Sequence, residues 1–377
     1  MAHPLFVIAA AYYGGKMLYK LLNETDERFE KEFDPDQVIN CHSLLTSFHA
    51  AHIKLDKDRW HELRAHGFRT HDRIVAGLKA KNDPTPCERV LQGSFGMKTV
   101  AQPHPDTAEH YDIDLGIVFR NEELLKSRGG EMSPLDVRTM VFDALGEDSR
   151  FSSSPEKKEN CIRVNYSDHH VDVPSYRYAD DNDDAPYELA SSTWKSSSPK
   201  EVTKWFEEAV KIKSPDDDRG QLRRVVQMLK YYSKSRPSWN APSGLIISRL
   251  VVDAFPVGGF PKRDDLALVL TLLAIYRTLQ ESLEVEHPVL KEYITKTDSD
   301  ACMVNFRDNL EKHLENLNAL TEEGISHVAA KKAWGKVFKH SFFDEETENT
   351  NDIFGSGIAS MTPDSPVKRN DEGKRYG

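Results

Sequence analysis

The sequence contains little cysteine, no excess of basic residues and no apolar run long enough to span a membrane. Its four cysteines are far apart and form no CxxC pair, which argues against a zinc site and against a disulfide-stabilised secreted fold. We therefore expect a protein of the reducing cytoplasm. The formal net charge of -11 argues against a surface that attracts nucleic acid as a whole, so strong nucleic-acid binding is not expected.

An apolar run near the N-terminus, residues 5–13, is too short for a spanning helix, which needs about 20 apolar residues. No basic stretch or small-residue cleavage site marks it as a signal peptide. We expect residues 1–35 to form an N-terminal extension that is helical and packs on the body of the protein. Membrane contact through residues 5–22 is the alternative.

The apolar pattern changes along the chain. Helical spacing of apolar residues predicts helices within residues 36–80, and β-rich runs predict strands further on, two of which are joined as a hairpin. The expected strands span residues 113–119, 161–166 and 170–174. From residue 198 the pattern is helical again. The expected later helices span residues 221–232, 241–254, 264–283, 301–320 and 321–339.

Two aspartates, Asp112 and Asp114, begin one of these strands. Side chains of a strand alternate between its faces, so both carboxylates point the same way. Neighbouring carboxylates repel each other and are stable mainly around a cation, and hard oxygen ligands suit Mg²⁺ or Mn²⁺. A third carboxylate, Asp172, lies in the apolar stretch VDVP on an expected neighbouring strand. Three aspartates from two adjacent strands can hold two divalent ions, the arrangement that supports phosphoryl transfer.

A small turn, Gln92-Gly93-Ser94, precedes the aspartates. A glycine there lets backbone amides approach a phosphate, and the hydroxyl of Ser94 adds a hydrogen-bond donor. A DxD pair alone is equally consistent with solvated carboxylates at the start of a strand. The combination of QGS, DID and VDVP in this order favours a metal-dependent nucleotidyl transfer site.

The helix expected at residues 221–232 carries a basic ridge, which we define as Arg223, Gln227, Lys230 and Lys234. These residues recur at intervals of four, three and four, and so share one face of the helix. A solvated charged face and a phosphate-binding face both explain such a row. We expect Lys230 to bind phosphate.

Several segments of the sequence, taken in order, resemble those of one family: QGSFGMKT, YDIDLG, HVDVPSYRYA, SPKEVTKWF, LRRVVQMLKYY and APSGLIISRLVV. The chain is similar to the bacterial cGAS/DncV-like nucleotidyltransferases (CD-NTases), and nearest to their DncV-type dinucleotide cyclases. The resemblance implies an α+β fold with a polymerase-β-like nucleotidyltransferase core at residues 36–190 and a C-terminal helical nucleotide-binding domain at residues 191–343. Residues 344–377 are expected to form a disordered tail.

The resemblance also implies roles for individual residues. Asp112 and Asp114 would bind two Mg²⁺ ions, for which Mn²⁺ can substitute, and Asp172 would complete the metal and catalytic site. The residues expected to contact nucleotides are Gln92, Gly93, Ser94, Ser197, Lys230 and Ser243. Met97 stands where the nearest relative carries an aromatic residue that can stack on a base. Base preference is therefore not transferred from the family.

The function implied by the resemblance is to join and cyclise NTPs, with ATP and GTP as expected substrates. The expected product is a cyclic di- or trinucleotide second messenger of the cGAMP type, used in bacterial anti-phage (CBASS) signalling. The alternatives are synthesis of linear 2′-5′ oligonucleotides, nucleotide transfer to a macromolecule, and a non-enzymatic nucleic-acid sensor. The terminal Gly377 is also a candidate for conjugation by ubiquitin-transfer-like accessory enzymes, as in several members of the family.

Overall fold

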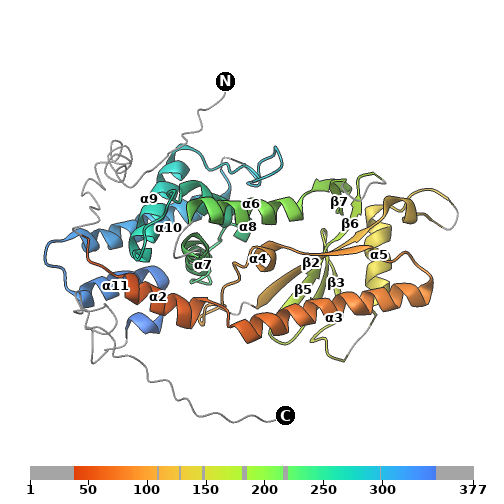
Figure 1. Ribbon diagram of the computed structural model, residues 1–377, viewed down its shortest axis with the longest axis horizontal. Helices are drawn as coiled ribbons and strands as arrows, with labels where there is room; N and C mark the ends of the chain where they lie inside the picture. Colours follow the sequence, from red (N-terminus) through yellow and green to blue (C-terminus); the bar gives the residue numbers. More distant parts are fainter. Residues whose placement is uncertain are drawn as a thin grey trace, which may run out of the picture.

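The computed structural model describes residues 38–107, 110–126, 129–146, 149–180, 185–214, 220–297 and 299–344. The described residues form two lobes along the long axis of the molecule, one built on a β-sheet and the other on helices (Figure 1). This architecture confirms the predicted α+β class. The predictions for the N-terminal extension, for membrane contact at residues 5–22 and for Gly377 fall outside the described residues.

Within the described residues, the sheet lobe has eight strands. They are β1 (Glu88–Leu91), β2 (Tyr111–Phe119), β3 (Glu156–Lys157), β4 (Ile162–Asn165), β5 (His169–Val173), β6 (Ser175–Tyr178), β7 (Tyr187–Ala190) and β8 (Trp194–Ser197). The order is β3-β4-β5-β2-β6-β7-β8, and β1 pairs separately with β2. Strand β2 is central because it pairs in parallel with both β5 and β6. The predicted hairpin is confirmed as the antiparallel pair β4 and β5.

Two helices, α3 (Lys57–Lys81) and α5 (Pro134–Leu145), pack together beside this sheet (Figure 1). The N-cap of α3 is Asp56, whose side chain accepts hydrogen bonds from the next turn. The cap of α5 is a reciprocal capping box between Ser133 and Asp136. A Cβ on Gly77 of α3 would lie 1.9 Å from the backbone oxygen of Ala144. Only glycine therefore allows the two helices this close approach.

The helical lobe surrounds α7, whose residues are almost all buried. Its main helices are α6 (Pro199–Lys213), α7 (Gln221–Ser233), α8 (Gly244–Ala254), α9 (Asp264–Glu281), α10 (Ala301–Leu317) and α11 (His327–Phe338). The last helix is shorter than the one predicted at 321–339. Gly324, which precedes this helix, has φ of +73°. A backbone in the left-handed region cannot continue a right-handed helix, so the helix begins only after this residue.

The lobes divide the chain differently from the expected boundaries at 36 and 190. Helix α2 (His42–Phe48) and the short π-helix η2 (His49–Ile53) share the apolar core of the helical lobe. At the other boundary, β8 belongs to the sheet and pairs with β7. Apolar periodicity shows which face of a helix is buried but not which partner buries it. The sequence pattern therefore does not reveal that α2 and η2 pack with the helical lobe.

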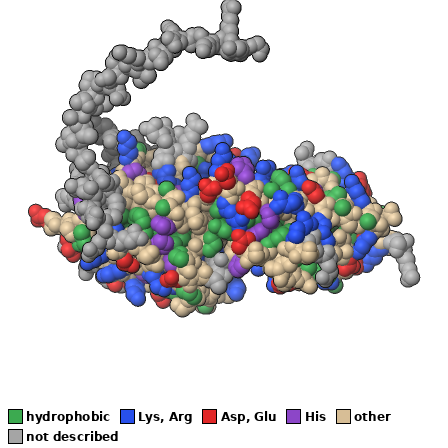
Figure 2. Space-filling model, turned by 90° about the horizontal axis from the view of Figure 1, so that it is seen from below, with side chains coloured by type: hydrophobic (Ala, Val, Ile, Leu, Met, Phe, Trp, Pro, Cys, Tyr) green, Lys and Arg blue, Asp and Glu red, His purple; other side chains and the backbone are tan. Residues whose placement is uncertain are grey.

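The surface of the described residues mixes charges of both signs. On the face in Figure 2, acidic, basic and histidine side chains are interspersed. No helix within the described ranges is long and apolar enough to cross a membrane.

Candidate active site

A cavity of about 410 Å³ contains most of the residues predicted for the site. Its walls come from β2 and the β1–α4 turn of the sheet lobe and from α7 and α8 of the helical lobe, where α4 is the short helix Gly93–Gly96. The predicted residues that line it are Gln92, Gly93, Ser94, Asp112, Asp114, Ser197, Lys230 and Ser243. A second cavity of about 520 Å³, between α3 and the β4–β5 turn, contains none of them.

The three predicted aspartates lie on adjacent strands. In the parallel pairing of β2 with β5, Asp114 lies opposite Asp172 and Asp112 lies opposite His170. All four side chains therefore project from the same face of the sheet. Asp172 is buried behind the cavity wall, and Arg163 of β4 donates to both of its carboxylate oxygens, at 2.7 and 2.6 Å. The predicted neighbour strand of Asp172 is thus confirmed, and Arg163 fixes the orientation of its carboxylate.

The two aspartates of β2 have different electrostatic surroundings. Burial, and then the charges of Asp112 and Asp172, raise the pKa of Asp114 well above its usual value. Burial also acts to raise the pKa of Asp112, but the hydrogen bond and charge of His170 outweigh it and lower that pKa. His170 Nε2 lies 3.0 Å from Asp112 Oδ1. Burial is thus the main cause of the raised pKa of Asp114, and repulsion by the two neighbouring carboxylates adds to it.

This cluster fits a divalent cation. Asp112, His170 and Asp172 each have a ligand atom within 4.8 Å of the others. Carboxylate oxygens are the ligands that Mg²⁺ and Mn²⁺ prefer. A cation would also relieve the repulsion that raises the pKa of Asp114. The chemistry of the donors and the excess negative charge therefore agree with the metal expected from the sequence.

The Gln92-Gly93-Ser94 turn is held against β2. The backbone N–H of Gln92 donates to the backbone oxygen of Asp114 at 3.1 Å, and Tyr176 donates its hydroxyl proton to Gln92 Oε1 at 3.0 Å. Gly93 has φ of +59°, and a Cβ there would lie 2.2 Å from Asp114 Oδ2. The glycine is thus required both for the backbone conformation and for the position of the Asp114 carboxylate.

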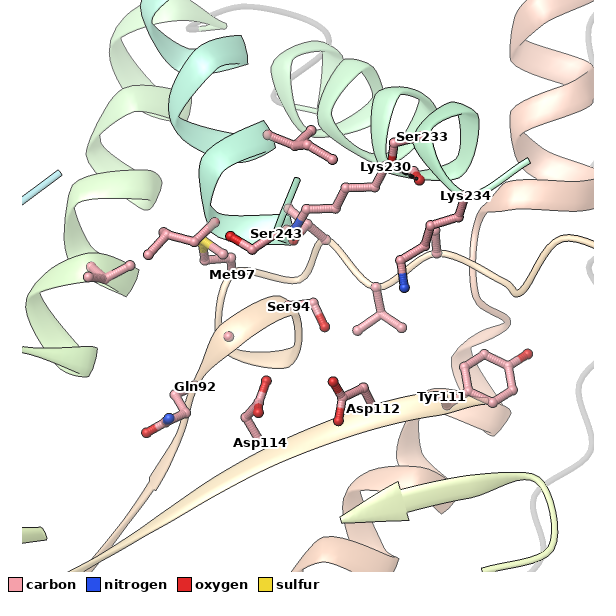
Figure 3. A pocket seen from close by; sticks show the side chains of 18 of the residues that line it. Gln92, Ser94, Met97, Tyr111, Asp112, Asp114, Lys230, Ser233, Lys234 and Ser243 are labelled. Carbon is pink, nitrogen blue, oxygen red and sulfur yellow. Dashed lines mark hydrogen bonds between the residues drawn. The ribbon is translucent and has the colours of Figure 1, made fainter. Parts of the chain in front are cut away.

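Lys230 reaches the cavity from the opposite wall. Figure 3 shows Asp112 and Asp114 rising from β2 toward the side chains of Lys230 and Lys234. Lys230 is buried, and its Nζ donates to Thr99 Oγ1 at 2.8 Å. Burial, and then the charge of Lys234, lower the pKa of Lys230 to about 7. A buried amine facing two carboxylates suits a substrate that brings its own negative charge.

The basic ridge does not act as one surface. Gln227 is buried and donates to the backbone oxygen of Val100 at 2.9 Å. Arg223 pairs with Glu207 at 2.8 Å. Within the ridge, only Lys230 and Lys234 line the cavity. The solvated-face interpretation is therefore wrong for Gln227 and Lys230.

Three further predicted positions have specific surroundings. Ser243 is the N-cap of α8 and accepts a hydrogen bond from the backbone of Ile246. Ser197 ends β8 at the edge of the cavity. Met97 is 2% exposed and forms part of the cavity wall (Figure 3). Its sulfur can contact a base by van der Waals packing but lacks the flat face of an aromatic ring.

Sequence reasoning missed His170, Arg163 and Tyr176. Strand alternation could have identified His170, because it stands two residues before Asp172 and so shares its face. Arg163 and Tyr176 depend on strand pairing, which brings Arg163 opposite Asp172 and Tyr176 beside β2. No local signal in the sequence marks either residue.

The segment that carries most of the site residues matches the model of a known family. Residues 87–176 match the family model described as the nucleotidyltransferase domain of cyclic GMP-AMP synthase DncV-like proteins. The match includes Gln92, Ser94 and all three aspartates. The match confirms the predicted resemblance of this segment to the CD-NTases and supports a nucleotidyltransferase.

Solved structures of DncV proteins share the fold of about four fifths of this chain. Vibrio cholerae DncV cyclic AMP-GMP synthase, in complex with the linear intermediate 5′ pppA(3′,5′)pG, is 17% identical with a TM-score of 0.62 and covers 80% of this chain and 96% of its own. Escherichia coli DncV, in its 3′-deoxy GTP bound form, is 18% identical with a TM-score of 0.61 and covers 77% and 92%. A search of curated protein sequences found no match.

Proposed function

We propose that this nucleotidyltransferase joins two NTPs and cyclises the product into a cyclic dinucleotide. The observation that carries the proposal is the cavity in which Asp112 and Asp114 face Lys230 and Lys234 across a space bordered by the Gln92-Gly93-Ser94 turn. Acidic residues on one wall suit cations, and basic residues on the other suit phosphates. A nucleoside triphosphate with its bound cation satisfies both walls.

The chain's own residues would position the reactants. Lys230, Lys234 and Ser243 approach the triphosphate of the donor nucleotide from the helical lobe, and Ser94 does so from the sheet lobe. Ser197 stands at the edge of the same cavity, where a base would lie. Because phosphoryl transfer needs little covalent participation from the protein, such positioning and charge neutralisation account for most of the catalysis.

In each of the two steps, a ribose hydroxyl oxygen bonds to the α-phosphorus of a triphosphate. The bond from that phosphorus to the oxygen bridging to the β-phosphate breaks, and pyrophosphate leaves with the electron pair. Asp172, oriented by Arg163, would complete the catalytic site from behind the cavity wall and help to activate the attacking hydroxyl, whose proton passes to water. The second step acts on the triphosphate of the linear intermediate and closes the ring.

Asp112, Asp114 and Asp172 would hold two Mg²⁺ ions, or Mn²⁺ in their place. Such ions supply Lewis-acid polarisation of the α-phosphate and stabilise the leaving pyrophosphate. The expected substrates are ATP and GTP and the expected product is of the cGAMP type. The similar DncV structures with 3′-deoxy ATP and 3′-deoxy GTP support these substrates. Anti-phage (CBASS) signalling is proposed from the family resemblance, as is conjugation through Gly377.

The test is product formation by the purified full-length chain. The protein is incubated with all four NTPs and Mg²⁺ or Mn²⁺, then with phosphatase, and the resistant products are separated by chromatography and identified by mass. We expect a cyclic dinucleotide from the wild type and none from the double variant Asp112→Asn/Asp114→Asn. Glu322→Gln, a change in the turn before α11, serves as the control and is expected to retain activity.

Other outcomes would change the proposal. Phosphatase-sensitive products joined 2′-5′ would replace cyclisation by linear synthesis. Equal product from wild type and double variant, under both metals, would overturn the assignment of the cavity as the active site.

A further inference from the structure

His170 lies in one cluster with Asp112 and Asp172, although the proposed nucleotidyl transfer gives it no role. It lies opposite Asp112 in the pairing of β2 with β5, and its Nε2 is 3.0 Å from Asp112 Oδ1. Its side chain is 19% exposed, compared with 50% for Asp112 and 11% for Asp172. The imidazole is thus partly exposed and adjacent to the most exposed carboxylate of the cluster.

The geometry allows one ion to contact three of these side chains. Ligand atoms of Asp112, His170 and Asp172 lie within 4.8 Å of one another. Two ligands bound to the same ion at about 2.1–2.3 Å are at most about 4.5 Å apart. The 3.0 Å between His170 Nε2 and Asp112 Oδ1 is already within that limit, and the remaining pairs lie within 4.8 Å.

The carboxylates around His170 favour a ligand that adds no negative charge. Asp172 already accepts two hydrogen bonds from Arg163, which offsets much of its charge. Each of its oxygens retains a further lone pair for an ion. Asp114 faces the cluster from β2, and Lys234, the C-cap residue of α7, contributes positive charge from the helical lobe. His170 is the side chain beside Asp112 that can add a ligand without adding repulsion.

We propose that His170 is a nitrogen ligand of the divalent cation, together with Asp112 and Asp172, and that it makes this site prefer Mn²⁺ to Mg²⁺. Mg²⁺ is a hard ion that takes oxygen ligands, whereas transition-metal ions accept imidazole more readily. A site with three carboxylates alone would lack this preference. The proposal rests on the metal site of the proposed function and adds a determinant of which ion it takes.

The experiment detects the bond to nitrogen directly. Full-length protein is loaded with Mn²⁺ alone, without nucleotide, and the electron spin-echo envelope modulation is recorded. We expect the modulation of a directly bound imidazole ¹⁴N, which changes to that of ¹⁵N when the protein is labelled with ¹⁵N-histidine. This signal should be absent from His170→Gln and present in His110→Gln, which removes a histidine that lines the cavity.

Calorimetry with Mg²⁺ and with Mn²⁺ measures the preference. In His170→Gln the affinity for Mn²⁺ should fall roughly tenfold or more while that for Mg²⁺ changes little. Isotope labelling of the wild type gives a result even if the variant does not fold. Mn²⁺ binding without nitrogen modulation, or equal losses of both metals in the variant, would show that His170 only orients Asp112 and would overturn the proposal.

The two proposals fail in different ways. Nitrogen modulation together with no nucleotide product would contradict the synthase but not the ligand. Product formation with no nitrogen modulation would contradict the ligand but not the synthase.

Discussion

Gly93→Ala is the sharpest single test of the site. The substitution adds one methyl group at the turn that precedes the aspartates. That Cβ would lie 2.2 Å from Asp114 Oδ2 and 3.1 Å from its Cγ. Ordinary carbon–oxygen contacts are longer by about 1 Å. Because the backbone of Gln92 is bonded to that of Asp114, the carboxylate is the part that can move.

The substitution should lower both stability and the rate of product formation, but to different extents. An alanine held at φ of +59° loses about 1–2 kcal/mol of stability. A displacement of about 1 Å at a reacting centre lowers the rate about 100-fold. We therefore expect a modest loss in the free energy of unfolding and a much larger loss of product formation.

Gly324→Ala is the matched control, since Gly324 has φ of +73° and no atoms near its would-be Cβ. It should show a similar loss of stability in thermal or denaturant unfolding, with a rate of product formation within about twofold of wild type. Product is measured from ATP and GTP at a temperature where both variants are folded. If Gly93→Ala made product as fast as Gly324→Ala, the position of Asp114 would not matter to the reaction and the assigned site would be wrong.

Three further predictions follow from the described contacts. Gly77→Ala should lower the free energy of unfolding by about 2–3 kcal/mol, because its Cβ would meet the backbone of α5 at 1.9 Å; unchanged unfolding would contradict the close packing of α3 and α5. Asp114→Asn should abolish product. It should also raise the free energy of unfolding in EDTA at pH 7, because the fold raises the pKa of the Asp114 carboxyl and the protein therefore loses stability once the pH exceeds the pKa of that carboxyl in the unfolded chain. A lower free energy of unfolding of the variant in EDTA would refute this. Burial lowers the pKa of His49 to about 4 from 6.5, so protonation favours the unfolded chain as pH falls below 6.5. Between pH 7 and 5 the free energy of unfolding should fall by about 2 kcal/mol because of His49, and by less in His49→Gln. Identical pH profiles of unfolding for the two proteins would exclude this contribution of His49.

Burial and neighbouring charges differ among the site residues in ways that the sequence could not show. Lys230 was expected on a basic ridge, but packing places it in the interior with a pKa of about 7. The neighbours that surround a side chain come from elements distant in the chain, so local patterns carry no information about them. The same reason explains why α2 was assigned to the sheet lobe although it packs with the helical lobe.

Local sequence pattern is enough to show that Asp112 and Asp114 share one face of a strand, since alternation is a local property of an extended backbone. It also predicts that Asp172 lies on a strand of a hairpin and that the residues of α7 form a helix with an apolar stripe. Which side chains meet depends on how the strands and lobes pack. Strand register set Arg163 against Asp172 and His170 against Asp112, and the packing of the lobes brought Lys230 over the aspartates. These contacts depend on pairing between segments that are separate in the chain, and pairing is settled only when the whole core is assembled.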